Sequence, residues 1–221
     1  AFGGGCFCFS GLVTLRNCSV SGNSTAGNGA AAGGIYNELG SVNLTDSIVL
    51  GNVSTSGNAN DDEIAVGPFA NIVRVGGNIV GGNRFEDDTD VGAVTAIEVF
   101  AATEEVTAAD GNATGVDAGV LADNGGPTET ILNLAGGAAQ DAGQPTSEPP
   151  TDQRGETRPV GDNDLGAVEL REAPSLIVTT TEDVVDASDG ETSLREAVIF
   201  ANQQAGADTI TFDPNADDFS G

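Results

Sequence analysis

The sequence predicts an all-β chain folded as a parallel β-helix, a solenoid in which each coil takes about 29 residues. Two observations predict this fold. The stretch TLRNCSVSGN at 14–23 nearly recurs as NLTDSIVLGN at 43–52, and a fixed period of this size is typical of repeat architectures. Within each copy apolar and polar residues alternate, as in LVTLRN and SVNLTD, a pattern that favours strands over helices.

A third copy, NIVRVGGNIVGGN at 71–83, follows with two residues inserted. Strands of neighbouring coils pair about 4.8 Å apart, so equivalent side chains of successive copies form rows. The alignment predicts three inward rows: Val13, Val42 and Val73; Leu15, Leu44 and Val75; Val20, Val49 and Val80.

Each copy ends on the dipeptide Gly-Asn. Glycine supplies the unusual backbone angles that a turn needs, and asparagine tolerates the left-handed region. Stacked asparagines also hydrogen-bond to one another along a ladder. We therefore expect Asn23, Asn52 and Asn83 to form one structural column rather than a ligand site.

The repeat fades after residue 90, and the stretch 136–164 is rich in proline, glycine and charge. This composition predicts loops and an end cap. This stretch also predicts an ion-pair cluster that stabilises the cap, formed by Asp152, Arg154 and Arg158. Buried arginines normally pair with carboxylates.

A short hinge, REAPS at 171–175, ends the first region. We expect residues 1–171 to be the closing part of a β-helix unit. Residues 172–221 are expected to be the opening strand-helix-strand segment of a following unit.

The second region predicts one short amphipathic helix of about three turns. Ser193 and Glu196 have the spacing of a capping box, and Gly206 is a natural stop. Apolar residues at helical spacing share one face: Leu194, Ala197, Val198 and Ala201. We expect this helix to cover the open end of a β-helix, since exposed strand edges invite aggregation.

Three stretches resemble known bacterial families. DGETSLREAVIFANQQAGADTITFDP (189–214) resembles the CSLREA-type segment that opens secreted β-helix domains, with Thr192 in place of the usual cysteine. LADNGGPTETILNLAGGAAQDAG (121–143) and DQRGETRPVGDNDLGAVEL (152–170) resemble the closing segment of choice-of-anchor Q surface proteins. AGGIYNELGSVNLTDSIVLGN (32–52) is similar to the coils of these proteins, of polymorphic outer-membrane proteins and of pectin-lyase-like folds.

The resemblance implies a right-handed parallel β-helix on a secreted or surface-anchored bacterial protein. It carries over no catalytic residues, since these families have none defined. The closing motif precedes the opening motif, as if the chain were cut from a tandem array. Expected partners are therefore copies of itself, packed head to tail, or adjacent tandem units.

Composition excludes several kinds of chemistry. The chain has 34 acidic residues against seven arginines and no lysine or histidine, for a net charge of −27. Histidine-based nucleophiles and zinc sites are excluded, as are Schiff bases and a P-loop. The charge argues against nucleic-acid binding, and no apolar run is long enough for membrane insertion. Surface glycans are the remaining class of expected partner.

The cysteines do not form the even pattern of a disulfide scaffold. Cys6, Cys8 and Cys18 all lie in the first copy. We expect them to be small buried side chains, with a Cys6–Cys18 or Cys8–Cys18 disulfide as the alternative.

The alternative function is that of a carbohydrate-active protein. Glycoside hydrolysis needs two carboxylates about 5–9.5 Å apart, and Asp46 is the only acid at a strand position in the first two copies. A lyase needs calcium-binding aspartates beside an arginine base, and Arg16 and Arg74 lie outside the acidic clusters. We therefore expect no enzymatic activity.

Calcium is the one cofactor that the acidic clusters allow, because it binds six to eight oxygens from carboxylates, carbonyls and water. The best candidate ligands are Asp186 and Asp189, followed by Asp162 and Asp164. The competing interpretation is a solvated acidic surface. The function that we expect is extracellular or cell-surface and structural: a stalk, adhesin or fibre module.

Overall fold

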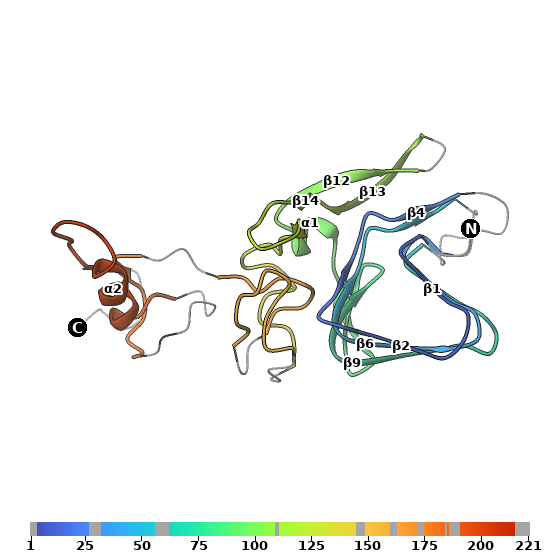
Figure 1. Ribbon diagram of the computed structural model, residues 1–221, viewed down its shortest axis with the longest axis horizontal. Coiled ribbons are helices and arrows are strands. Elements are labelled where there is room, and N and C mark those ends of the chain that lie inside the picture. The colour runs from blue at the N-terminus through green and yellow to red at the C-terminus, as the bar shows by residue number, and fades with distance from the viewer. Residues whose placement is uncertain are drawn as a thin grey trace. The chain divides into compact units, whose positions relative to one another are not determined.

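The structure is a computed structural model that describes residues 4–26, 32–55, 62–108, 111–144, 149–159, 163–171, 175–183, 185 and 191–214. It is mostly β, with 40% strand and 7% helix, and its sheets are mixed and not closed. The chain divides into two compact units, Ala1–Glu169 and Leu170–Gly221 (Figure 1). In the described part of the chain, no helix is long and apolar enough to cross a bilayer.

Strands of the repeated copies pair side by side in parallel. We call residues 4–26, 32–55 and 62–80 the first, second and third copies. One sheet contains β1 (Cys6–Cys8), β5 (Ile35–Asn37) and β8 (Ile64–Val66); a second contains β2 (Leu12–Arg16), β3 (Ser19–Val20), β6 (Ser41–Val49) and β9 (Asn71–Val80); a third contains β4 (Ser24–Thr25) and β7 (Val53–Ser54). In Figure 1 the three copies, coloured from blue to green, follow nearly the same path.

The pairing of the first two copies keeps the predicted offset. Cys6 pairs with Ile35, Val13 with Val42 and Ser24 with Val53, which is 29 residues in each case. Alternation explains why: every second side chain points inward, and a slip of one residue would turn the apolar side chains outward. The buried members of this core are Cys8, Ile35, Val42, Leu44, Val49 and Val80.

Two of the predicted rows are wrong in the third copy. Val42 pairs with Ile72, and Leu44 pairs with Arg74. Val73 and Val75 instead face outward, with 36% and 42% of their surface exposed. The third row is right, since Val49 pairs with Val80.

The two inserted residues explain this change of register. Ser41 pairs with Asn71, one residue later than the 29-residue offset predicts, so the first extra residue precedes β9. The second lies in a β-bulge, where Gly76 and Gly77 stand opposite Asp46. Gly76 has a φ of +69°, a conformation that glycine adopts readily. The strand therefore reaches the register that the repeat predicts only after residue 77.

The predicted place of Asn83 is also wrong. β10 (Asn83–Glu86) turns back and pairs antiparallel with β9, with Asn83 opposite Val80, and β11 (Thr89–Ala93) pairs with β10. Gly81 and Gly82, with φ of +59° and +81°, form the two-residue turn that such a hairpin favours. Asn83 therefore leaves the path on which Asn23 and Asn52 lie.

The rest of the first unit packs on the second sheet, around Ile48 and Ile79, and on Val53 of the third sheet. It contains α1 (Ala96–Val99), the antiparallel pair β12 (Thr103–Thr107) and β13 (Ala113–Gly119), and the antiparallel pair β14 (Leu121–Ala122) and β15 (Thr130–Ile131). Residues described after β15 up to 169 form no helix or strand, as the composition predicts. This part contributes Val99, Phe100 and Leu165 to a core that also holds Ile48 and Ile79.

The second unit contains β16 (Ile177–Val178), α2 (Leu194–Ala201) and β17 (Thr211–Phe212), and its two strands are parallel. Ser193 and Glu196 form the capping box that their spacing predicts: the Ser193 N–H donates to Glu196 Oε2 over 2.8 Å, and the Ser193 hydroxyl accepts from the Glu196 N–H. The helix has eight residues, about two turns rather than the three predicted. Leu194 and Val198 remain 49% and 42% exposed.

Candidate functional site

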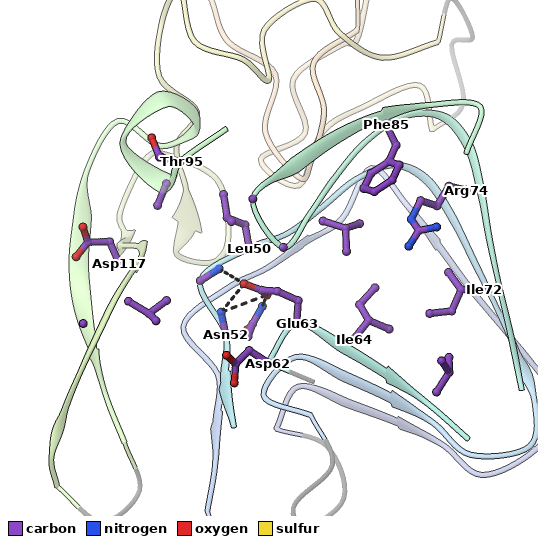
Figure 2. A pocket seen from close by; sticks show the side chains of 18 residues that line it. Leu50, Asn52, Asp62, Glu63, Ile64, Ile72, Arg74, Phe85, Thr95 and Asp117 are labelled. Carbon is purple, nitrogen blue, oxygen red and sulfur yellow. Dashed lines mark hydrogen bonds between the residues drawn. The ribbon is translucent and has the colours of Figure 1, made fainter. Parts of the chain in front are cut away.

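A pocket of about 650 Å³ lies beside β8 and β9 (Figure 2). Its apolar lining includes Leu50, Ile64, Ile72, Val80 and Phe85. The polar side chains that line it include Asn52, Asp62, Glu63, Arg74, Thr95 and Asp117. In Figure 2 the Glu63 and Arg74 side chains lie on either side of Ile64.

Glu63 is held by N–H donors of the second copy. Its Oε1 accepts the Gly51 N–H over 2.7 Å, and its Oε2 accepts the Asn52 side-chain amide over 2.6 Å. The Asn52 backbone N–H lies 3.2 Å from both oxygens. Burial raises the pKa of Glu63 to about 7, with a small contribution from Asp62, although these hydrogen bonds oppose the shift.

Glu63 ends a polar column whose middle member is buried. The Asn23 amide donates to Asn52 Oδ1 over 2.9 Å, and the Asn52 amide also donates to the Val20 carbonyl. Asn52 itself is fully buried. Glu63 thus takes the place in the column that the repeat predicts for Asn83.

Arg74 lies at the other wall of the pocket. Leu15 pairs with Leu44, and Leu44 pairs with Arg74. An arginine therefore occupies the position at which the repeat predicts Val75. Its guanidinium lies 4.4 Å from the centre of the Phe85 ring and pairs with Asp88 over 2.7 Å. Arg74 and Phe85 therefore cover the apolar side chains at this end of the three copies.

A second cluster of charges is buried in the loops after β15. Arg158 pairs with Glu169 over 2.5 Å, with 1% and 0% of their side chains exposed, and Arg154 pairs with Asp152 over 2.8 Å. The predicted ion-pair cluster is thus present. The sequence did not predict Glu169 as the partner of Arg158, because Glu169 lies 11 residues later and no local pattern connects the two.

The two acids of this cluster have opposite pKa shifts. Burial and the nearby Asp164 raise the pKa of Glu169 to about 8, although Arg158 opposes the shift. Burial alone would also raise the pKa of Asp152. Hydrogen bonds from the Glu169 N–H, the Arg154 side chain and the Glu156 N–H outweigh burial there, so the pKa of Asp152 is lowered.

Asp46 has a structural role in this arrangement. It has a positive φ of 47°, as does Asn17 one copy earlier with 46°, so both residues turn the chain at the same corner. Asp46 Oδ1 accepts the Gln144 N–H over 3.0 Å. Burial raises its pKa, against hydrogen bonds from Gln144 and Gly77.

The calcium candidates are only partly described. Asp162, Asp186 and Asp189 lie outside the described residues. Asp164 is buried, and its Oδ1 accepts the Asp141 N–H over 2.9 Å. Within the described ranges, no three or more histidine, cysteine or acidic side chains are grouped so that they could hold a metal ion. Calcium binding stays a prediction.

The three cysteines are free thiols. Cys8 is buried, while Cys6 and Cys18 are half-buried. Burial raises the pKa of both Cys6 and Cys18, which disfavours the reactive thiolate. The alternative of a disulfide is not realised in this structure.

No protein-family model matches the chain, and neither a curated protein nor a solved structure is significantly similar to it.

Proposed function

We propose that the chain is a non-enzymatic structural module of the bacterial cell exterior, a stalk, fibre or adhesin built as a right-handed parallel β-helix. The observation that carries this proposal is the parallel pairing of equivalent strands from successive copies. A molecule that repeats this pairing grows by one strand spacing of about 4.8 Å per copy. Its length then depends on the number of copies.

The polar columns, with Asn52, Ser47 and Asn78 buried, support a role that needs rigidity. Ser47 and Asn78 form a second column of this kind: the Cys18 N–H donates to Ser47 Oγ, and the Ser47 N–H donates to Asn78 Oδ1 over 3.1 Å. Each such bond holds one copy on the next with a fixed register. Leaving any of these buried groups unpaired would cost about 1–3 kcal/mol.

The strongly shifted carboxyl groups also favour a structural role over catalysis. Glu63 accepts hydrogen bonds from Gly51 and Asn52, and Glu169 is paired with the buried Arg158. A catalytic acid-base pair instead needs two carboxyl groups directed at one substrate position. Burial and neighbouring acids within the fold thus account for both pKa shifts.

The first copy offers edges for further pairing. β1, β2 and β4 are edge strands of the three sheets. Ser41 donates to the Gly11 carbonyl and Asn17 to the Thr45 carbonyl, so odd-numbered residues of β2 face β6. Because backbone groups alternate along a strand, the Thr14 N–H points to the free edge. Copies of the chain or adjacent tandem units are the partners that we propose for these edges.

The experiment compares Thr14→Pro with Thr14→Val. Proline removes the free-edge N–H, whereas valine keeps it and has a similar size. We expect the wild-type chain and Thr14→Val to form elongated particles in electron microscopy at high concentration, and Thr14→Pro to form several-fold fewer. Equal particle lengths for all three proteins, at equal thermal stability, would contradict end-to-end pairing. Cleavage of a polysaccharide by the wild-type chain would contradict the structural role itself.

A further inference from the structure

An exposed apolar corner runs along the three copies. The turns that follow β1, β5 and β8 place Phe9, Leu39 and Phe69 on the surface, with 59%, 45% and 81% of their area exposed. A backbone hydrogen bond joins the first two of these turns: the Leu39 N–H donates to the Phe9 carbonyl. Large apolar side chains thus recur at one corner of successive copies.

An aromatic pair extends this corner onto the neighbouring sheet. Phe7 pairs with Tyr36 in the strand register, and their rings stack with centroids 5.6 Å apart and an interplanar angle of 14°. The Phe7 ring is also 6.4 Å from Phe9. We call the surface formed by Phe7, Phe9, Tyr36, Leu39 and Phe69 the apolar corner.

The segments that form the apolar corner carry almost no charge. Cys6–Leu12, Ile35–Ser41 and Ile64–Asn71 contain one acidic residue, Glu38, and no arginine, in a chain with 34 acidic residues and a net charge of −27. Outside these segments, Asp62 and Glu63 directly precede Ile64, and Asp46 follows Ser41 by five residues. The apolar corner is therefore a surface of low charge on a strongly acidic molecule.

We propose that the apolar corner binds the apolar corner of a second copy of this chain, side by side. Two chains of net charge −27 repel each other across acidic faces, and the repulsion is weakest where both faces carry the fewest charges. Burial of apolar surface there contributes about 25 cal/mol per Å². Contiguous exposed apolar surface of this kind marks interaction sites.

Other partners fit this surface less well. An anionic membrane or polyanion needs basic side chains, and the three segments have none. The side-by-side contact does not use strand edges. It can therefore be tested independently of the end-to-end pairing proposed above.

Sedimentation velocity of the full chain tests this proposal. We expect wild-type protein to form dimers in the micromolar range, and Leu39→Glu/Phe69→Glu to weaken the dimer at least tenfold. The matched control is Ile97→Glu/Leu121→Glu, which adds two charges at side chains that are 63% and 60% exposed elsewhere. A second variant, Leu39→Ser/Phe69→Ser, removes the apolar groups without adding charge.

The expected result is that both corner variants reduce dimer formation, that the control does not, and that all keep the wild-type circular dichroism spectrum. Thr14→Pro should still form the side-by-side dimer. Wild-type protein that stays monomeric at high micromolar concentration would overturn the proposal. Equal weakening by the control, or a dimer that survives both corner variants, would overturn it as well.

Discussion

The side-chain amide of Asn23 donates to Oδ1 of Asn52 over 2.9 Å, across 29 residues of sequence. The side-chain amide of Asn52 in turn donates to Glu63 Oε2 over 2.6 Å. One fully buried side chain thus connects all three copies. The 29-residue repeat is therefore stabilised by polar contacts as well as by rows of apolar side chains.

Replacing Asn52 by alanine should lower the free energy of unfolding by about 2–3 kcal/mol, because it leaves Asn23, Glu63 and the Val20 carbonyl without this partner. Urea unfolding followed by circular dichroism measures the change. Asn71→Ala, at an exposed side chain, is the control and should stay within about 0.5 kcal/mol of wild type. Equal effects of the two substitutions would contradict a structural column.

The buried pair of Arg158 and Glu169 should be costly to break from one side. Arg158→Met leaves the buried Glu169 carboxyl without its guanidinium donor, with the Asp164 N–H as its remaining donor, and should cost about 3–5 kcal/mol. Arg84→Met removes the exposed pair with Glu86 and should cost at most about 1 kcal/mol. Arg158→Met/Glu169→Leu should recover part of the loss, because no buried carboxyl is left without its guanidinium donor. No recovery in the double variant would contradict the pair as the cause.

Glu63 should make stability depend on pH. Its pKa rises from 4.5 to about 7 on folding, so the folded state binds more protons between these values. Stability should therefore be highest below about pH 4.5 with respect to this group, and it should fall by on the order of 1–3 kcal/mol as pH rises past 7.

The measurement is urea unfolding between pH 4.5 and 8, and the relevant quantity is the slope against pH. Glu63→Gln should flatten the slope, whatever its effect on absolute stability. Glu104→Gln, at an exposed glutamate, should leave the slope unchanged. A slope that is identical in Glu63→Gln and wild type would show that Glu63 has an ordinary pKa.

The sequence predicts the copies whose register is local and regular. Alternation and the 29-residue offset are enough to pair Val13 with Val42 and Leu15 with Leu44. The same two features do not predict that Leu44 pairs with Arg74. The third copy has two inserted residues, and the pattern does not say whether they lie before the strand or within it. The dipeptide Gly76-Gly77 is the signal that places one of them in a bulge.

The candidate site was less predictable for a related reason. Glu63 reaches Asn52 only through the folded backbone, and it lies outside the repeated motif. A hairpin takes Asn83 away from the column, although its Gly81-Gly82 turn has a recognisable composition. By contrast, the capping box needs only Ser193 and Glu196, three positions apart in the chain, and it was predictable from sequence alone.

The parallel register of the copies is the central claim, and nuclear Overhauser contacts of Val42 test it most directly. We expect the Val42 methyl groups to contact both Val13 and Ile72, the residues that pair with Val42 on either side. The same spectrum should place the Asn52 amide next to Asn23 and Glu63. Contacts of Val42 with Val73 in place of Ile72, or an antiparallel pattern between β2 and β6, would contradict the account.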